Sequence, residues 1–343
     1  MDTDFTYIEE CNNNTMLSSS HFIDIIKKLQ SLLPIHTSPN KSNKLCDTCN
    51  DSEYYSLSHI KWNSNMIHML TAHHSYPSEY FVKVMSNICI INDRIVNPPL
   101  EIPEDMIYDL NYVTLHHNQL LIIDALLHNG GQRIYEYDDK NIYSEHSGII
   151  TIKNNVVESI IVSTKTDRVD VNDTSIFLPH NEKTCYEYEY MFHTHPNTNV
   201  DGERRKTGIL YEFPSSNDIF YFVQCHNDGK SQGSIIVTPE GTYVIRPVKY
   251  ADKITLNGVT SAELNSFIIQ LEKEAFAKNK NIIQKLKNED QFHKYVSYNF
   301  DYIDKYNNFI NRYNVMIEYY PREKKNNHWF LRQINIVHLN EKN

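Results

Sequence analysis

The sequence predicts a protein of the α/β or α+β class, in which helices and strands are mixed within one main domain. Apolar residues recur at helical spacing in several segments, whereas other segments alternate as strands do. Two pairs of strand-like runs flank short polar turns, a pattern typical of hairpins. The 343 residues, of which 40% are hydrophobic and 22% are charged, suffice for one sizeable core with one or two appended modules.

Residues 1–44 are expected to form no domain of their own. Residues 1–18 are polar and are predicted to be disordered. A short helix is predicted from Ser20 onward, ended by Pro34, and residues 37–43 suit a linker. The start lacks the features of a secretory signal, and no apolar run is long enough to cross a bilayer. An intracellular protein without membrane association is therefore expected.

Residues 45–100 are predicted to form a small module that holds a structural metal ion. Cys46 and Cys49 have the spacing of zinc-binding thiolates, and His68 and His73 follow on a helix-like segment. These four residues resemble a Cys-Cys-His-His zinc finger, and this resemblance implies a closed zinc site. His59 is an alternative ligand, and two free thiols beside an amphipathic helix are the alternative interpretation. The net charge of −10 favours a protein partner over nucleic acid for this module.

Residues 105–250 carry the mixed helix and strand signals. An apolar helix is predicted from Met106 to His128, with a stop at Asn129-Gly130-Gly131. The other elements expected here are a hairpin of residues 148–152 and 156–162, a strand of residues 186–192, a helix of residues 216–225, and a hairpin of residues 234–238 and 242–245.

Residues 258–343 are predicted to form a helix-rich extension that ends in a strand pair. Thr260 and Glu263 have the spacing of a capping box, and apolar residues then follow the helical repeat. The two final strands are expected at residues 315–319 and 330–339, on either side of a polar turn.

The sharpest chemical signal is the segment His193-Thr194-His195-Pro196. Residues i and i+2 of a strand project from the same face, so both imidazoles can reach one metal ion. A second signal is the pair Ser215 and Asp218 at the opening of a predicted helix. Each signal has an ordinary alternative. The serine and aspartate have capping-box spacing, and a lone His-x-His is usually structural or exposed.

The third element is Glu145, which opens a predicted strand in the segment Glu145-His146-Ser147-Gly148. Followed by the two other signals in this order, the segment closely resembles the JAMM motif of MPN+ (JAB domain) zinc metalloproteases. The resemblance covers about residues 105–250 and implies an MPN/JAB-like core, a fold related to that of cytidine deaminases.

The resemblance also implies a role for each of these residues. His193, His195 and Asp218 would be the ligands of a catalytic zinc ion, with the fourth position left for water. Glu145 would act as the general base, and Ser215 would donate a hydrogen bond to the oxyanion. The family usually cleaves an isopeptide or peptide bond at the C-terminus of ubiquitin or a ubiquitin-like protein. We therefore expect conjugates of this kind as the substrate.

The sequence departs from the family between the second histidine and the serine, where residues 197–213 form an unusually long insert. This insert is expected to overhang the zinc ion and to influence substrate choice. Within it, Asp201 is an alternative third ligand, and Glu158 in the next predicted strand is an alternative base. A hydrolase for a non-ubiquitin substrate and a non-catalytic MPN-type scaffold or binding module are the alternative functions.

Overall fold

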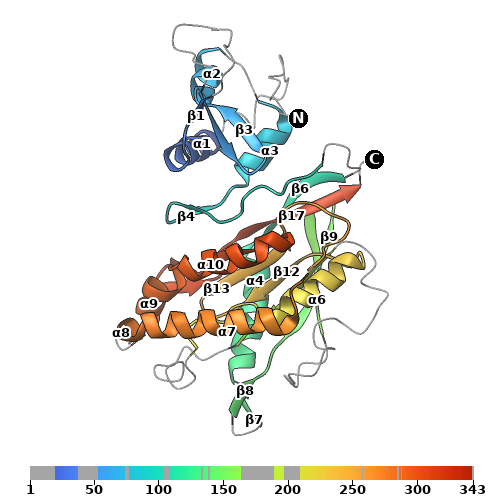
Figure 1. Ribbon diagram of the computed structural model, residues 1–343, viewed down its shortest axis with the longest axis vertical. Coiled ribbons are helices and arrows are strands. Elements are labelled where there is room, and N and C mark those ends of the chain that lie inside the picture. Colours follow the sequence, from blue (N-terminus) through green and yellow to red (C-terminus); the bar gives the residue numbers. More distant parts are fainter. Residues whose placement is uncertain are drawn as a thin grey trace. The chain divides into compact units, whose positions relative to one another are not determined.

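The computed structural model divides the chain into two compact units, residues 1–101 and residues 102–343 (Figure 1). This division lies close to the boundary expected between the module of residues 45–100 and the domain that begins near residue 105. The structure describes residues 20–37, 53–73, 77–103, 108–132, 134–137, 140–163, 189–196, 209–256, 258–283, 286 and 288–341. No helix within these ranges is long and apolar enough to cross a membrane.

The first unit has a small aromatic core between its helices and a three-stranded sheet. The predicted N-terminal helix is present as α1 (Ser20–Leu32), which ends before Pro34. Phe22 of α1 and Trp62 both pack edge-on against Phe81, with ring centroids 6.2 and 6.1 Å away. The other elements of this unit are β1 (His36–Thr37), β2 (Glu53–Leu57), β3 (Ile60–Asn63), α2 (Met66–Ala72), α3 (Glu79–Ser86), β4 (Ile90–Ile91) and β5 (Arg94–Ile95).

The second unit is built on a six-stranded mixed sheet with the order β10-β9-β11-β12-β13-β14. The first predicted hairpin is present as β9 (Ser147–Lys153) and β10 (Val156–Val162), and the second as β12 (Ser231–Val237) and β13 (Gly241–Pro247). Between the hairpins lies β11 (Glu189–Thr194), antiparallel to β9 and parallel to β12. Helices and several sheets are thus mixed in one unit, which confirms the predicted α+β class.

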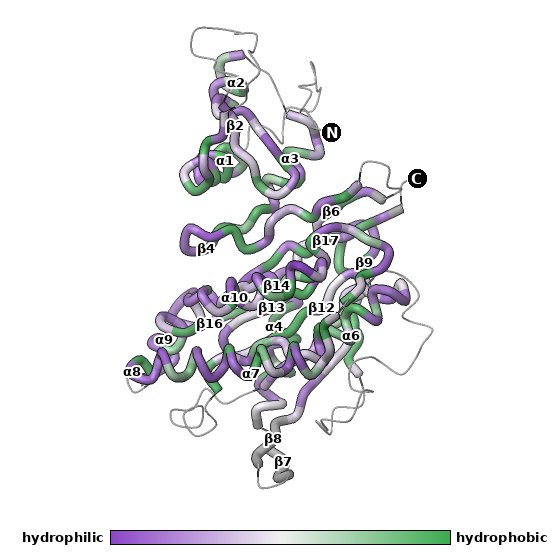
Figure 2. The backbone as a smooth tube through the Cα atoms, viewed as in Figure 1, coloured by the Kyte–Doolittle hydropathy of each residue, from purple (hydrophilic) through white to green (hydrophobic). Residues whose placement is uncertain are grey.

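Three helices of the second unit pack together beside the sheet. The predicted helix α6 (Ser216–Asn227) contacts β12 and α7 (Ser261–Lys278), and α7 contacts α10 (Asp301–Ile310). The predicted capping box of Thr260 and Glu263 starts α7. Figure 2 shows hydrophilic and hydrophobic residues alternating along α7, as expected for a helix with one buried face.

The prediction of one helix from Met106 to His128 is wrong in its first half. Residues Tyr108–Leu115 form strand β6, and helix α4 (His117–Gln132) begins only afterwards and continues through both glycines of the expected stop. Strand β6 pairs along its length with β17 (Ile334–Glu341), near the other end of the chain. Because that partner is remote in sequence, local periodicity could not indicate the strand. A short hairpin, β7 (Ile134–Tyr137) and β8 (Lys140–Tyr143), follows α4.

The prediction that residues 258–343 end in their own strand pair is also wrong. Both strands exist, but β14 (Val315–Pro321) pairs with β13, whereas β17 pairs with β6. Every residue of β14 is buried, so this strand gains more from joining the central sheet than from a surface hairpin. The remaining elements are α8 (Lys280–Ile283), α9 (Glu289–Phe292), the π-helix η3 (His293–Ser297), the 3₁₀-helix η4 (Asn311–Tyr313), β15 (Glu323–Lys325) and β16 (His328–Phe330).

Candidate metal centre

The two histidines of the His-x-His segment are positioned by the middle of the central sheet. His193 lies in β11, where it pairs with Ser147 of β9 and Ile236 of β12. His195 follows the strand, and its backbone N–H donates to the Val237 carbonyl at 2.9 Å. The extended backbone therefore continues past the strand end, and both side chains project from one face as predicted.

Asp218 is positioned by the first turn of α6. Ser215 is the N-cap residue, and its hydroxyl accepts from the Asp218 N–H at 3.2 Å. In return, the Asp218 Oδ2 accepts from the Ser215 N–H at 2.6 Å. The two residues thus form the capping box that was the ordinary explanation of their spacing. The same box fixes the Asp218 carboxylate, so capping and metal binding are compatible roles.

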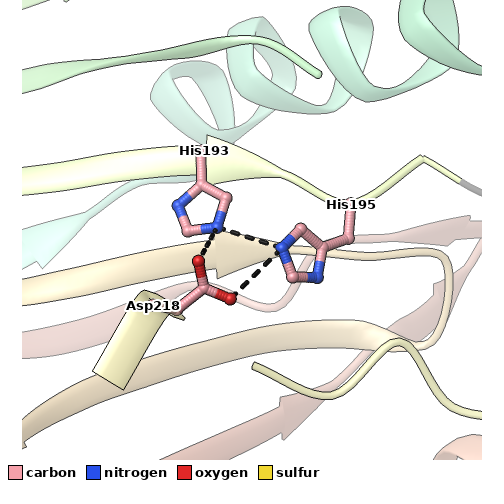
Figure 3. A group of neighbouring side chains, drawn as sticks. All are labelled: His193, His195 and Asp218. Carbon is pink, nitrogen blue, oxygen red and sulfur yellow. Dashed lines mark hydrogen bonds and ion pairs between the residues drawn. The ribbon is translucent and has the colours of Figure 1, made fainter. Parts of the chain in front are cut away.

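The three side chains converge on one point (Figure 3). The Nε2 atoms of His193 and His195 are 3.0 Å apart. The Asp218 oxygens lie 3.1 Å from the His193 Nε2 and 3.4 Å from the His195 Nε2. All three residues offer a ligand atom within 4.8 Å of the others, so they form a candidate metal-binding triad.

The separations between these ligand atoms fit a small tetrahedral ion. Ligands bonded at about 2.0–2.2 Å with tetrahedral angles are roughly 3.3–3.6 Å apart, and the three observed distances lie within or up to about 0.3 Å below this range. The His193 and Asp218 side chains are only 4% and 2% exposed, whereas that of His195 is 12% exposed. The triad is therefore largely shielded from solvent and is most accessible beside His195.

The electrostatics of the triad favour positive charge at its centre. Burial by itself would raise the pKa of Asp218, but His193 and His195 hold that pKa well below its ordinary value. Burial lowers the pKa of His195, but the nearby carboxylates of Asp218, Glu145 and Glu212 together raise it to about 10. Protons and a metal ion compete for the same imidazole nitrogens. The positive charge beside Asp218 can therefore come either from protonated histidines or from a bound metal ion.

Glu145 lies two residues before β9 and interacts electrostatically with all three residues of the triad. The Thr194 N–H donates to the His146 carbonyl at 2.9 Å, and the His146 N–H donates to the Thr194 Oγ1 at 3.0 Å. These bonds extend the contact between the two chain segments beyond the paired residues of β9 and β11, towards Glu145 and His195. Burial raises the pKa of Glu145, while His195 and His193 counteract the rise. A buried carboxyl group with a raised pKa is a candidate for proton transfer.

The chain has a relative of nearly the same length. It is 42% identical over 344 residues to "Uncharacterized protein R413" of Acanthamoeba polyphaga mimivirus, and the match covers 96% of this chain and 97% of the viral protein. The chain belongs to the family of that viral protein. Because the match spans almost the whole length, the sequence similarity extends over both compact units. No family model and no solved structure matches the chain.

The alternative site residues lie elsewhere or outside the described residues. The Glu158 side chain is 53% exposed and pairs with Lys153 at 3.4 Å, so Glu158 has the environment of a surface residue and not that of a buried base. Asp201 lies outside the described residues, as do residues 197–208 of the insert.

The zinc finger expected in the N-terminal unit is described only in its histidine half. The rings of His68 and His73 meet edge-on with their centroids 5.0 Å apart. Cys46 and Cys49 lie outside the described residues. The alternative ligand His59 hydrogen-bonds to Tyr80 at 3.1 Å.

Two acidic residues near the triad, Glu212 and Glu272, are not predicted from the sequence. Burial raises the pKa of Glu272 in α7 to about 7, with a further contribution from the charge of Glu212, while His195 counteracts it. The charge of Glu212 also contributes to the raised pKa of His195. Because Glu212 lies in the insert and Glu272 lies on a later helix, no sequence spacing links them to the histidines.

Proposed function

We propose that this protein is a zinc-dependent isopeptidase or peptidase with a JAMM-type centre in an MPN/JAB-like core. The observation that carries the proposal is the convergence of residues from three separate segments. Two imidazoles, the Asp218 carboxylate and the Glu145 carboxyl share one neighbourhood, and Ser215 caps the helix that presents Asp218. These are the residues on which the resemblance to the JAMM motif rests.

The donor set supports zinc as the metal ion. Two neutral imidazoles and one carboxylate, with one coordination position left open, are typical of catalytic zinc sites in hydrolases. Zinc held by His193, His195 and Asp218 would supply Lewis acidity, which lowers the pKa of water and polarises a carbonyl oxygen.

The chain's own residues would handle the protons and the developing negative charge. Glu145 would remove a proton from the attacking water and deliver it to the leaving amine, and its raised pKa suits both steps. The Ser215 hydroxyl accepts a hydrogen bond from the Asp218 N–H, which leaves its own proton to donate to the oxyanion. Ubiquitin or a ubiquitin-like protein joined through an isopeptide bond is the proposed substrate class.

Metal content and cleavage together test the proposal. Purified protein should contain about one zinc ion per catalytic centre by mass spectrometry, and it should cleave a panel of di-ubiquitin linkages. Glu145→Gln should retain zinc but lower kcat by roughly 100-fold or more, since general acid–base catalysis contributes about 10²–10⁴-fold. Glu158→Gln, the same chemical change on an exposed strand, should leave turnover unchanged.

The outcomes separate the alternative functions. Zinc without cleavage of any ubiquitin-type conjugate would favour a hydrolase for another substrate or a binding module, and would contradict the proposed substrate class. Full activity of Glu145→Gln would contradict the assignment of the base.

A further inference from the structure

We propose that Glu240 and Tyr306 are positioning residues for the metal centre, because they clamp the segment of residues 211–215 that leads into α6. This inference rests on the proposed metal centre. It adds that the C-terminal helices determine where the third ligand lies. Each would act through its hydrogen bond to the backbone that leads to Ser215 and Asp218.

The segment is anchored near both ends by side chains from other elements. The Glu212 N–H donates to the Glu240 Oε1 at 2.6 Å. The Tyr306 hydroxyl donates to the Pro214 carbonyl at 2.8 Å, directly before the N-cap residue of α6. Both anchoring side chains belong to fully buried residues, so water does not compete for these bonds.

Aromatic packing fills the space between the two anchors. The rings of Tyr211 and Phe213 stack with their centroids 5.1 Å apart. Phe213 also meets the rings of Tyr243 and Tyr306 edge-on, at 6.4 and 6.2 Å. The segment is therefore held on its backbone by hydrogen bonds and on its side chains by a buried aromatic cluster.

Each anchor is itself fixed to the central sheet. Glu240 lies in the turn between β12 and β13, and its Oε1 also accepts from the Tyr243 hydroxyl at 3.0 Å. Next to Tyr306, the Asn307 side chain exchanges two hydrogen bonds of 2.8 Å with the Ile317 backbone of β14. These hydrogen bonds thus fix the start of α6 relative to the same sheet that carries the two histidines.

A small shift of the segment of residues 211–215 would change the position of the metal ligand Asp218. The capping box couples the Ser215 backbone to the Asp218 carboxylate, so movement of Pro214 would change the distance from Asp218 to both imidazoles. Loss of partners that orient metal ligands typically weakens metal affinity by about 10- to 100-fold. The histidines would be unaffected, because the backbone bonds of β11 hold them.

The test is Tyr306→Phe in the full-length protein, which keeps the ring and removes the hydroxyl. We expect zinc affinity to fall by about tenfold in a chelator competition, and kcat for a cleaved di-ubiquitin to fall with little change in KM. The visible bands of the Co²⁺-substituted protein should also shift, because they report ligand geometry. Tyr302→Phe is the matched control, since the Tyr302 hydroxyl, on the same helix, accepts from Asn279.

The result that overturns the inference is wild-type zinc affinity and an unchanged Co²⁺ spectrum in Tyr306→Phe. Failure of the wild-type protein to bind zinc would instead contradict the metal centre itself, so the two failures are distinguishable. Should Tyr306→Phe not fold, Glu240→Gln and Glu240→Leu make the same comparison from the other anchor. Gln keeps an acceptor oxygen and should bind zinc at least about tenfold more tightly than Leu; equal affinity would overturn the clamp.

Discussion

The two sides of the metal centre are held in different ways. On the strand side, β11 lies between β9 and β12, and backbone hydrogen bonds along both edges position the two histidines. On the helix side, hydrogen bonds of individual side chains position the third ligand. The capping box orients Asp218, and Glu240 and Tyr306 hold the segment before it.

This difference has consequences for how each side tolerates substitution. A sheet ladder depends little on which side chains the neighbouring strands carry, provided that the backbones can approach each other. A helix start that depends on single hydroxyl and carboxyl groups loses its position when one of these groups is removed. The strand side should therefore be sensitive to steric change, and the helix side to the loss of particular polar atoms.

Removal of one ligand from either side should have the largest effect. His193→Ala deletes a strand-side ligand. Asp218→Asn keeps an oxygen that can accept from the Ser215 N–H, so α6 should still start in the same place. Each variant should weaken zinc binding by roughly 100-fold or more, because a direct ligand contributes more than the partners that orient it. Metal content by mass spectrometry after dialysis measures the loss, and a zinc content equal to that of the wild-type protein in either variant would contradict its ligand role.

A steric change should disturb the strand side more than any loss of a polar group there. A Cβ atom at Gly148 would lie 2.0 Å from the Ile161 carbonyl oxygen and 2.6 Å from the Phe192 ring, on the two strands that flank β9. Gly148→Ala should cost about 3 kcal/mol or more in the free energy of unfolding, because β9 cannot stay paired on both edges without a backbone shift.

The control for this substitution is Gly131→Ala in α4, where an added Cβ meets nothing within 4 Å. Alanine is the better helix former, so this variant should gain up to about 1 kcal/mol. Urea denaturation measures both changes. A stable Gly148→Ala protein would show that the strand side accommodates bulk and would remove the proposed contrast between the two sides.

The smallest expected effect concerns Glu272, near the helix side. Its pKa in the folded protein is about 7, whereas the ordinary value is 4.5, owing to burial and then to Glu212. His195 acts in the opposite direction, and the Tyr306 hydroxyl also lies within electrostatic reach. Because the folded state binds the proton more tightly, Glu272 favours folding below about pH 4.5. This contribution is lost as the pH rises through about 7.

Glu272→Gln should therefore raise Tm at pH 8 relative to wild type and remove part of the decline in stability between pH 5 and pH 8. Thermal unfolding of both proteins across this range measures the difference. Glu158→Gln, a change at an exposed carboxylate, should show no such dependence on pH. Identical pH profiles for Glu272→Gln and wild type would show that the pKa of Glu272 is not raised in the folded protein.

The strand side was the more predictable of the two from sequence. Alternation places His193 and His195 on one face whatever strand lies beside them, and a hairpin signal before them indicated β9 and β10. Glu145 could be paired with them only through its resemblance to a known motif. The proximity of Glu145 to His195 depends on how β9 pairs with β11, and this register is a tertiary property.

The two strands that differ from the sequence prediction have one cause in common. The sequence predicts the first half of a helix where β6 lies, because the partner of β6, strand β17, lies near the C-terminus. It predicts a terminal strand pair for β14, because nothing near β14 in sequence shows that it pairs with β13. In both cases the strand is stabilised by pairing with, and burial against, residues far along the chain. Local sequence patterns cannot indicate such remote partners.

By itself, the sequence determined the local elements: the His-x-His strand, the capping box at Ser215 and Asp218, the two hairpins and helices α1, α6 and α7. These follow from periodicity and capping, which act over a few residues. Only the tertiary structure decided that the C-terminal strands join the sheets, that Glu212 and Glu272 lie near His195, and that Tyr306 reaches Pro214. Such contacts depend on burial and hydrogen bonding between remote segments, and these arise only when the chain is folded.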